Sequence, residues 1–595
     1  MEQRRLAHTV KPAKLLTYHD CYDGFQCARL DVPLNWKATE EERERYRAAI
    51  ALIKLPARVS VTHASYGGMI LVNPGGPGES GVDQVLDRGH AIQTIVDSAT
   101  DTANASANDR YFDIIGFDPR GVKHTTPSLR CFSDAFSQQV WLLERPGYGE
   151  IYESDSSFAL EWARTKALGQ SCTSGAANNG IVRYANTAQV VEDMLEIVER
   201  HGEWREQHLV DDHCHGLAGS QQVLRSSAFE RGTEMMNYWG VSYGSLLGQT
   251  FAAMHPDRVG RLVIDGIPDP EDYYFGRWLA NLQDSDKVMR RLCEYCFEAG
   301  PAKCPLYTGS SADDIEDLLS WLMVDLKDNP NTFVASSSGN SDPMVITFDD
   351  FYLQAINAMA FPNAAAEDFF DLLNQLHRGN VTKIAASKQA QLDVAASLAS
   401  CRHSEQGCFP GRYFGLLGPT PVIECMDSAP YKQKDITKEE FKSYYQKLQQ
   451  QSEWFSPSWA RHRMSCIGIK EQPAWQYNFD ITGDTAHPVL IIGNTHNTVT
   501  PIANARKVAK LFPGSVVLQQ DSQGHCSHAM PSTCTAKYVR EYFQTGEIPK
   551  ADSICQPDYL PFIGKRSSSH EASPSIADDA IGRALEKLSE SWVVI

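Results

Sequence analysis

Short apolar runs recur along the chain, and most of them end at Gly, Asn or Asp. These runs predict strands at residues 46–55, 67–76, 111–121, 235–244, 261–270, 488–497 and 515–525. Strands that are apolar at successive positions are buried on both faces, which favours a parallel sheet. Amphipathic segments at residues 187–202 and 244–259 lie between strands. This alternation predicts a doubly wound α/β core with right-handed crossovers, and it places the chemistry at the carboxyl ends of the strands.

The alternation stops after Asp269, and strand signals resume only at Pro488. Helical patterns fill the interval, so a large insertion separates two core strands and is expected to form a cap over the site. A shorter polar stretch, residues 203–233, is expected to be a surface loop. The predicted organisation is an N-terminal part of the core at 1–270, a helical cap at 271–485, a C-terminal part of the core at 486–565, and a flexible linker with a C-terminal helix at 566–595.

Composition places the chain among globular proteins, since 42% of its 595 residues are hydrophobic and 22% are charged. The net charge of −19 repels phosphate backbones, so no nucleic-acid partner is expected. No stretch approaches the roughly 18 apolar residues that a membrane span requires. The N-terminal residues lack the apolar core of a signal peptide. These features favour a cytoplasmic protein without a membrane span, with secretion as the alternative.

Several of the 15 cysteines are closely spaced. The groups are Cys21 with Cys27, Cys293 with Cys296 and Cys304, Cys401 with Cys408, and Cys534 with Cys555. Such spacings are typical of disulfide loops in an oxidising compartment, while buried free thiols in a reducing compartment fit the missing signal equally well. A zinc site is disfavoured, because the 293–304 cluster offers only three Cys ligands and no nearby His.

The first candidate for chemistry is the sequence Gly240-Val241-Ser242-Tyr243-Gly244. It stands between a predicted strand and a predicted helix, as a nucleophile elbow does. The glycines permit the tight strand-to-helix turn, and Ser242 then lies at a helix N-terminus, where the dipole stabilises developing negative charge. The alternative is a glycine-rich turn with an inert serine. The flanking elements favour a nucleophile at Ser242.

The second candidate is the stretch NPGGPG at residues 73–78, which directly follows a predicted strand. Because Pro has no N–H, Gly75 and Gly76 are the available backbone donors, and the N–H of Tyr243 would supply another. These groups are candidates for an oxyanion hole. A phosphate-binding loop is disfavoured, because the stretch matches neither glycine-rich phosphate motif. A simple turn remains the alternative.

The third candidate is His525, which follows the last predicted core strand. Where a nucleophile elbow is present, the usual chain order is nucleophile, acid and then His, which makes His525 the expected general base. His528 is the rival. The acid should lie on the loop after the strand at 488–497, yet residues 494–501 contain no Asp or Glu.

Together, the motifs NPGGPG, FDIIGFDPRGV, YWGVSYG, VIDGIPDP, IGNT…VTP and GHCS…C resemble the tripeptidyl-aminopeptidase-like and prolyl-aminopeptidase-like α/β-hydrolases, in particular their fungal branch. The resemblance spans about residues 20–560. It implies an α/β-hydrolase fold and a serine hydrolase that acts on small peptides, amides or esters through an acyl-enzyme, without a metal or organic cofactor. It assigns the nucleophile to Ser242 and the general base to His525. It places an Asp where this chain has Asn497 and a Pro where it has Thr498.

An Asn at the acid position can accept a hydrogen bond from the histidine, but it cannot offset the charge of the imidazolium. Three interpretations follow, in order of preference. Another carboxylate replaces the missing acid, with Asp265 and Asp269 best placed. Alternatively, Asn497 serves in a slower enzyme, such as a specialised intracellular or biosynthetic hydrolase or acyltransferase. In the third interpretation the chain is a catalytically degenerate hydrolase with a binding role.

Several further residues are candidates for substrate contact or structural support. Lys123 stands where the family usually has a small residue, so it is expected to alter substrate preference. Glu424 and Asp427 echo a family motif in the cap and are candidates for holding a substrate amine, with a disulfide-anchored turn as the alternative. Asp118 and Arg120 are expected to form a structural ion pair. The expected partner is a small molecule or a short peptide.

Overall fold

The computed structural model describes residues 10–144, 154–174, 180–214, 228–337, 340–401, 418–429, 436–566 and 576–590. A ten-stranded sheet forms the centre of the molecule. In sheet order its strands are β1 (His19–Cys21), β2 (Phe25–Pro33), β3 (Arg47–Leu55), β5 (Tyr111–Phe117), β4 (Tyr66–Asn73), β6 (Met236–Val241), β7 (Val259–Asp265), β10 (Leu490–His496), β11 (Val516–Gln523) and β12 (Ile554–Cys555).

The predicted doubly wound, mostly parallel sheet is confirmed. From β5 through β4, β6, β7, β10 and β11 to β12, every neighbouring pair is parallel, and only the pairs that involve β1, β2 and β3 are antiparallel. The apolar runs of the sequence form β3, β4, β5, β6, β7, β10 and β11. β2 was not predicted, because its sequence FQCARLDVP mixes polar residues into an edge-side strand.

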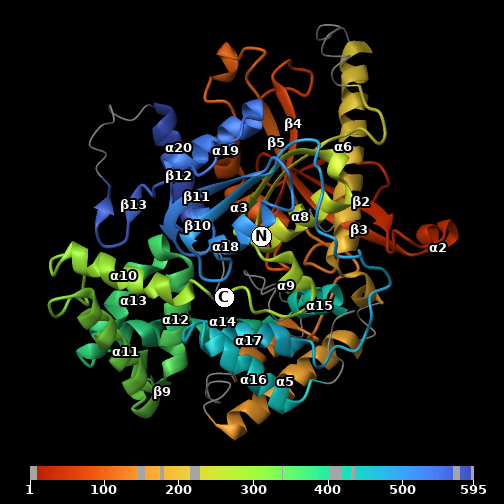
Figure 1. Cartoon of the computed structure of the whole chain (residues 1–595). Helices are drawn as coiled ribbons and strands as arrows, with labels where there is room; N and C mark the ends of the chain where they lie inside the picture. Colours follow the sequence, from red (N-terminus) through yellow and green to blue (C-terminus); the bar gives the residue numbers. More distant parts are fainter. Residues whose placement is uncertain are drawn as a thin grey trace.

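Helices cover both faces of the sheet (Figure 1). On one face, α3 (Gly81–Val96), α19 (Thr533–Thr545) and α20 (Ile576–Ser589) bury apolar side chains in one cluster. On the other face, α6 (Thr187–Cys214), α8 (Tyr243–Met254) and α18 (Ile502–Val508) contribute to a second, larger cluster. The guanidinium of Arg88 fixes α20 by donating to the carbonyl oxygens of Leu588 (2.8 Å) and Glu590 (2.6 Å).

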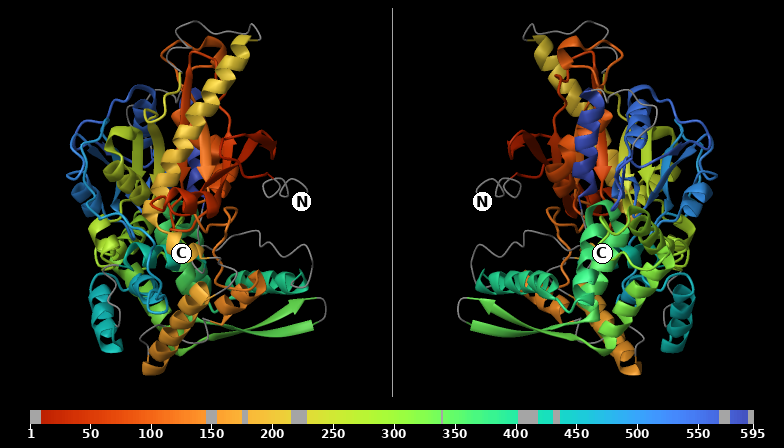
Figure 2. Two further views of the ribbon diagram at one scale, coloured as in Figure 1. Left: turned by 90° about the vertical axis from the view of Figure 1, so that its right-hand side faces the viewer. Right: turned by 90° about the vertical axis from the view of Figure 1, so that its left-hand side faces the viewer.

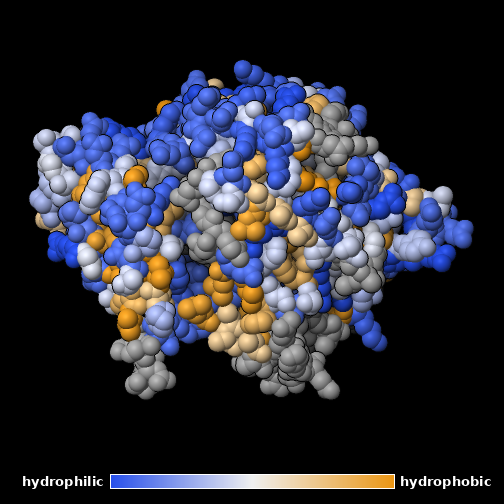
Figure 3. Space-filling view, turned by 90° about the horizontal axis from the view of Figure 1, so that it is seen from below, coloured by the Kyte–Doolittle hydropathy of each residue, from blue (hydrophilic) through white to orange (hydrophobic). Residues whose placement is uncertain are grey.

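Although β7 and β10 are neighbours in the sheet, the chain between them forms a separate helical layer, which we call the cap (Figures 1 and 2). Its helices are α9 (Pro270–Tyr274), α10 (Ser285–Ala299), α11 (Ala312–Asp328), α12 (Phe348–Ala360), α13 (Pro362–His377), α14 (Thr382–Cys401), α15 (Pro419–Asp427), α16 (Lys438–Gln449) and α17 (Ser456–Ser465). Seen from below, hydrophobic side chains gather toward the middle of the cap face, and hydrophilic ones dominate its rim (Figure 3).

Two helices from the first part of the chain also join the cap, which the sequence did not indicate. α4 (Ala135–Leu143) packs against α14, and α5 (Asp155–Ser174) packs against α17. The cap also contains a hairpin of β8 (Asn331–Ser337) and β9 (Asn340–Ile346), which projects beside α14 (Figure 2). The helical patterns on either side of it concealed these two strands from the sequence analysis.

The expected surface loop at 203–233 is wrong in its first part, because α6 continues to Cys214. Residues 203–214 contain no Gly or Pro to end the helix, and Arg205 forms an ion pair with Glu234 at 2.7 Å. Residues 215–227 lie outside the described part of the chain, as does most of the predicted linker at 567–575. No helix in the described ranges has the length and apolar content of a membrane-spanning segment.

Five disulfides cross-link the described residues. They are Cys21–Cys27, Cys131–Cys172, Cys296–Cys304, Cys425–Cys466 and Cys534–Cys555. Three of them join cysteines that the sequence grouped by spacing, and the other two join cysteines 41 residues apart, which spacing does not reveal. Cys293 and Cys526 are buried free thiols. Cys408 lies outside the described residues.

Candidate active site

Ser242 occupies the sharp turn between β6 and α8. Its backbone has φ 57° and ψ −123°, a region that residues with a side chain rarely adopt. Its N–H donates to the carbonyl oxygen of Asp265 at 2.8 Å. Packing requires the two flanking glycines: a Cβ at Gly240 would lie 2.2 Å from the carbonyl oxygen of Gly244, and a Cβ at Gly244 would lie 2.5 Å from that of Asn73. This is the geometry of a nucleophile elbow.

The glycine-rich loop after β4 lies directly against this elbow. A Cβ at Gly75 would lie 2.6 Å from the carbonyl oxygen of Val241 and 3.0 Å from the nitrogen of Tyr243. The N–H of Gly75 already donates to Oδ1 of Asn73 at 3.0 Å. In the described ranges, the N–H groups of Gly76 and Tyr243 have no protein acceptor. Of the three predicted oxyanion donors, these two therefore remain available.

His525 lies within hydrogen-bond distance of Ser242. Its Nε2 is 2.9 Å from the Oγ of Ser242. The side chain of Asn494, at the end of β10, donates to the carbonyl oxygens of Gly524 (3.0 Å) and Cys526 (2.7 Å). These are the residues on either side of His525, so Asn494 fixes the loop that carries the imidazole. Asn494 belongs to the motif IGNT, but nothing in the sequence gives it this role.

Asn497 is buried beside the imidazole, on the loop after β10. Its Oδ1 accepts the backbone N–H groups of Val499 (3.1 Å) and Thr500 (3.0 Å). The same atom lies 3.1 Å from Nδ1 of His525. Because two N–H donors face this atom, it is the amide oxygen, and the hydrogen-bond network assigns the proton of His525 to Nδ1. That tautomer leaves Nε2 free to accept the hydroxyl proton of Ser242.

Burial lowers the pKa of His525 to about 4. The imidazole is therefore neutral at neutral pH, which is the state that a general base requires. The Nδ2 group of Asn497 has no hydrogen-bond partner among the described residues. Thr500 adds a second polar contact, since its Oγ1 lies 3.4 Å from Nδ1 of His525.

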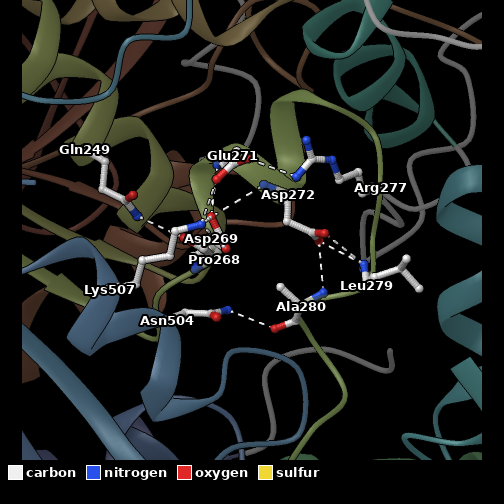
Figure 4. Close-up of polar contacts among 10 residues, drawn as sticks. All are labelled: Gln249, Pro268, Asp269, Glu271, Asp272, Arg277, Leu279, Ala280, Asn504 and Lys507. Atoms are coloured by element: carbon white, nitrogen blue, oxygen red, sulfur yellow. Dashed lines mark hydrogen bonds and ion pairs between the residues drawn. The ribbon is translucent and has the colours of Figure 1, made fainter. Parts of the chain in front are cut away.

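Asp265 and Asp269, the two carboxylates expected to replace the acid, have other partners. Asp265 accepts hydrogen bonds from the backbone nitrogen (3.0 Å) and the Oγ (2.5 Å) of Ser527, and burial raises its pKa to about 6. Asp269 begins α9 and forms an ion pair with Lys507 at 2.7 Å (Figure 4). Within the described ranges, neither carboxylate is hydrogen-bonded to His525, so Asn497 alone of the three faces Nδ1.

The cap carboxylates Glu424 and Asp427 are internal cross-links, which differs from the substrate contact expected of them. Glu424 pairs with Nδ1 of His462 at 2.9 Å. Asp427 accepts from the backbone nitrogen (2.7 Å) and hydroxyl (2.6 Å) of Thr187 and from the hydroxyl of Tyr273 (3.0 Å). Both carboxylate residues are only 2% exposed, and burial raises the pKa of Asp427 to about 7.

The polar loop after β5 also has internal partners. Lys123 forms an ion pair with Asp83 on α3. The predicted pair of Asp118 and Arg120 is wrong: the fully buried Arg120 binds Asp193 on α6, with Nε and Oδ2 2.5 Å apart. Asp118 instead accepts hydrogen bonds from the N-terminal turn of α3. The two charges separate because α6, whose partner role the sequence did not reveal, packs against this loop.

His528, the rival of His525, lies on the other side of the loop. It lines a cavity of about 70 Å³ between α3, α19 and α20. Burial lowers its pKa to about 3. A second residue that sequence analysis missed is Glu79, whose Cγ would lie 3.3 Å from a Cβ at Gly76. Burial and the charge of Asp83 raise the pKa of Glu79 to about 7. Nothing in the sequence marks Glu79 except its place after the glycine-rich loop.

The cap contacts both loops of the site. The N–H of His525 donates to the carbonyl oxygen of Ala360, at the end of α12, at 2.7 Å. The hydroxyl of Thr420, at the start of α15, donates to the carbonyl oxygen of Pro77. A Cβ at Gly78 would lie 2.9 Å from Oγ1 of Thr420, so the helix and the glycine-rich loop are in close contact.

Comparisons with known proteins agree with this arrangement. Residues 451–555 match the family described as TAP-like protein. Serine protease Hip1 of Mycobacterium tuberculosis (strain ATCC 25618 / H37Rv) is 23% identical over 532 residues, which cover 89% of this chain and 87% of the relative. Tripeptidyl aminopeptidase of Streptomyces lividans is 20% identical over 543 residues, covering 90% and 84%. Carboxylesterase B of the same M. tuberculosis strain is 41% identical over 110 residues, covering 18% and 17%.

These relatives, together with the strand order and the elbow after β6, identify the class of protein to which the chain belongs. The chain is a hydrolase with the α/β-hydrolase fold. The three relatives are bacterial, so they do not support the resemblance to a fungal branch in particular. In the described part of the chain, no group of three or more His, Cys, Asp or Glu side chains is arranged to hold a metal ion.

The arrangement of this hydrolase brings together the groups that acyl transfer requires. A serine hydroxyl lies against a neutral imidazole, and beside it lie two backbone N–H groups that have no acceptor among the residues the structure describes. An amide oxygen holds the far side of the imidazole. These groups can form an ester with a substrate acyl group and stabilise the tetrahedral intermediates on either side of it.

Proposed function

We propose that the protein is a serine hydrolase that cleaves small peptides, amides or esters, with peptides as the main class. Ser242 is the nucleophile, His525 the general base, and Asn497 the residue that orients the imidazole. The observation that carries the proposal is the continuous chain of contacts from Ser242 Oγ to His525 Nε2 (2.9 Å) and from His525 Nδ1 to Asn497 Oδ1 (3.1 Å). The relatives named serine protease and tripeptidyl aminopeptidase support peptides as the substrate class.

In the acylation step, the hydroxyl of Ser242 attacks the substrate carbonyl while Nε2 of His525 takes its proton. The N–H groups of Gly76 and Tyr243 hold the oxyanion that forms. The protonated imidazole then gives its proton to the leaving amine or alcohol, the carbonyl–leaving-group bond breaks, and an acyl-enzyme ester remains on Ser242. In deacylation, a water molecule repeats the sequence and releases the acid.

Asn497 orients the imidazole in this cycle, but it supplies no negative charge to stabilise the imidazolium. Its oxygen holds the Nδ1–H tautomer of His525, so the base has its lone pair on Nε2 from the start. A neutral amide does not stabilise the imidazolium that forms in each transition state. We therefore propose a working but slow enzyme, which corresponds to the second interpretation of the sequence. The other partners of Asp265 and Asp269 favour this version over carboxylate replacement.

The position of the cap favours small molecules as the proposed substrates. It touches both the loop of His525 and the glycine-rich loop through Ala360 and Thr420. A cap that lies against both loops restricts access to a bond held against Ser242, which favours short peptides and small esters over folded proteins as substrates.

We also propose that the chain matures in an oxidising compartment. The support is the five disulfides among the described residues, since such bonds persist in secreted or envelope proteins and are rare where thiols are kept reduced. This favours secretion, the alternative that the sequence analysis left open, over the cytoplasmic location.

Labelling with a fluorophosphonate probe tests the site without knowledge of the substrate, because the probe needs only an activated serine and an oxyanion hole. The unmodified protein and the Ser242→Ala and Asn497→Asp variants are treated in parallel, and the labelled residue is found by peptide mapping. Labelling at Ser242 that is absent from Ser242→Ala supports the nucleophile. A faster rate in Asn497→Asp supports Asn497 as the residue at the acid position.

A panel of tripeptide amides of aminomethylcoumarin, with free or acetylated N-termini, then tests the substrate class. Turnover of either series that disappears in Ser242→Ala supports peptide hydrolysis. Labelling of Ser242 with esters cleaved and no peptide cleaved would restrict the protein to ester hydrolysis. If neither the unmodified protein nor Asn497→Asp is labelled by the probe although both are folded, the catalytic assignment is overturned and the binding role is favoured.

A further inference from the structure

A second cavity, of about 910 Å³, opens within the cap. Its walls come from α5, from residues 275–279 after α9, and from the end of α17 with the residues that follow it. Neither Ser242 nor His525 lines it. Its volume lies in the range of about 300–1,000 Å³ typical of sites for small molecules and short peptides.

The charged side chains in the wall of this cap cavity are all cationic. Lys166, Arg277, Arg463 and Lys470 line it, and none of its described lining residues is Asp or Glu. This is unusual for a chain whose net charge is −19. A local concentration of one sign of charge in a recess attracts ligands of the opposite sign, even when the rest of the surface repels them.

Two of the four cationic side chains already interact with another side chain of the protein, and the other two have no ion-pair partner among the described residues. Arg277 pairs with Glu271 at 3.0 Å, and Arg463 lies over the ring of Tyr444 at 4.4 Å. Lys166 and Lys470 are exposed and have no ion-pair partner in the described part of the chain. These two ammonium groups therefore provide positive charge that a bound anion would neutralise.

The apolar part of the wall contains aromatic as well as aliphatic side chains. Trp162, Phe275 and Trp278 all line the cavity. Trp278 has φ 53°, which is a rare backbone conformation for a bulky residue. A hydrogen bond at the next residue fixes this conformation, because the buried carboxylate of Asp272 accepts the N–H of Leu279 at 3.0 Å (Figure 4). Strain of this kind is retained where the surrounding structure fixes it, and it often marks binding sites.

The frame of the cavity is rigid. The disulfide Cys425–Cys466 joins α15 to the end of α17. Gly169 of α5 approaches Gly468 so closely that a Cβ on Gly169 would lie 2.8 Å from the Cα of Gly468. Both connections fix the walls before a ligand arrives, which lowers the entropic cost of binding.

We propose that this cavity binds a short acidic peptide that carries an aromatic or aliphatic side chain between its carboxylates. The carboxylates pair with the ammonium groups of Lys166 and Lys470, and the apolar side chain packs against the half-buried rings of Trp162 and Phe275. A peptide of this kind combines the two features that the wall offers, positive charge and aromatic surface, and its size suits the cavity volume.

The cavity is separate from the active site but is connected to it through one segment of the chain. The segment that contains Trp278 continues to Asn281, whose Nδ2 donates to the carbonyl oxygen of Val499 at 3.0 Å. Val499 in turn belongs to the loop that carries Asn497. Binding in the cavity uses no reacting group, so it can be measured in a Ser242→Ala variant, and its failure or success is separate from that of the proposed reaction.

Isothermal titration calorimetry with Ser242→Ala protein measures the binding directly. The probe is acetyl-Asp-Glu-Phe-Asp with a free carboxylate, and the matched neutral probe is acetyl-Asn-Gln-Phe-Asn amide. We expect the acidic peptide to bind at least about tenfold more tightly, and added salt to weaken it. The double change Lys166→Gln and Lys470→Gln is expected to lower its affinity by about tenfold.

Two further variants control for charge and for folding. Lys166→Arg with Lys470→Arg keeps the charge and is expected to retain binding. Lys510→Gln with Lys550→Gln removes the same charge from exposed positions outside the cavity and is expected to leave the affinity unchanged. Equal affinity for the acidic and neutral peptides in the parent protein would overturn the proposal. An equal loss in the two Gln double variants would also overturn it, by assigning the effect to the overall charge.

Discussion

Asn497 presents its amide oxygen to Nδ1 of His525 at 3.1 Å. Two backbone N–H groups donate to the same oxygen, so the amide cannot turn its NH2 group toward the imidazole without losing both bonds. The position that usually carries a carboxylate thus keeps the direction of the hydrogen bond and loses only the negative charge. The consequences of that single difference can be measured.

Replacement of Asn497 by Asp is expected to raise turnover. The carboxylate has the same shape and stabilises the imidazolium of the transition state. The reverse change in a serine protease lowers turnover by about 10⁴, in part through the wrong tautomer. Because the tautomer is already held here, we expect a smaller gain of roughly 10- to 100-fold. Steady-state kinetics check it against Asn108→Asp, the same change at an exposed position. A folded Asn497→Asp without a gain would contradict the role of this residue.

The same variant is expected to move the acidic limb of the pH profile. Catalysis needs neutral His525, whose pKa burial lowers to about 4, so activity of the unmodified protein should rise through about pH 4 and then level off. A neighbouring carboxylate favours the protonated imidazole and raises its pKa by about 1–3 units. The limb of Asn497→Asp should therefore lie at higher pH. Profiles of kcat/KM from pH 3.5 to 8 test this, and superimposable profiles would refute it.

Substitution of Gly75 by Ala is expected to remove most activity. Gly75 has φ 104°, and a Cβ there would lie 2.6 Å from the carbonyl oxygen of Val241, so the loop must move away from the elbow. A displacement of this size at an oxyanion hole costs about 100-fold in kcat. Gly582→Ala in α20 is the control, because no atom of the described residues lies within 4 Å of a Cβ there. The prediction fails if Gly75→Ala retains full kcat.

Asn494→Leu is expected to lower both kcat and stability. The change leaves the buried carbonyl oxygens beside His525 without their donors, at a cost of roughly 2–4 kcal/mol in free energy of unfolding. Asn504→Leu is the matched control, since the buried Asn504 donates to Ala280, away from His525. Urea unfolding and steady-state kinetics separate the two effects. If both variants lose kcat equally, Asn494 has no special part in holding the imidazole.

Removal of the Cys425–Cys466 disulfide is expected to destabilise the cap. The bond closes a loop of 41 residues, and loop-closure entropy assigns such a cross-link about 4 kcal/mol. The Cys425→Ser, Cys466→Ser double variant should therefore melt at lower temperature in calorimetry and become more sensitive to proteolysis within the cap. Cys21→Ser with Cys27→Ser, whose loop spans 6 residues, should have a smaller effect. A larger loss of stability in the Cys21→Ser, Cys27→Ser variant than in the Cys425→Ser, Cys466→Ser variant would contradict this prediction.

The core of the fold could be predicted because its strands are apolar on both faces. β4, β6, β10 and β11 each end at the motif that the sequence analysis marked, and their carboxyl ends meet at the same edge of the sheet. That shared edge is why Ser242 and His525 could be grouped from sequence although they are far apart in the chain, whereas Asn497 was assigned through the family resemblance. The hairpin of β8 and β9 could not be predicted from the sequence, and neither could the extension of α6. In both segments, local sequence patterns compete with tertiary contacts.

The partners of charged residues were much harder to predict. The sequence offered four carboxylates as candidates for chemistry, yet each is held by a partner that only the folded chain supplies; they are Asp265, Asp269, Glu424 and Asp427. Thr187, one of the partners of Asp427, and Asp193, the partner of Arg120, both lie on α6, a helix that the sequence motifs do not connect with the site. A carboxylate at a plausible position in the sequence therefore says little until its hydrogen bonds are known.

The contact between Ser242 and His525 joins residues 283 positions apart. The cap is made between them, and β7 has no partner on one side until β10 has been synthesised. During translation, the nascent chain thus carries Ser242, the proposed nucleophile, for a long interval without His525, the proposed base. A product that ends prematurely, or is cut before β11, contains the elbow but not the imidazole. With the proposed roles of the two residues, hydrolytic capacity therefore requires synthesis of the chain through the whole cap and as far as His525.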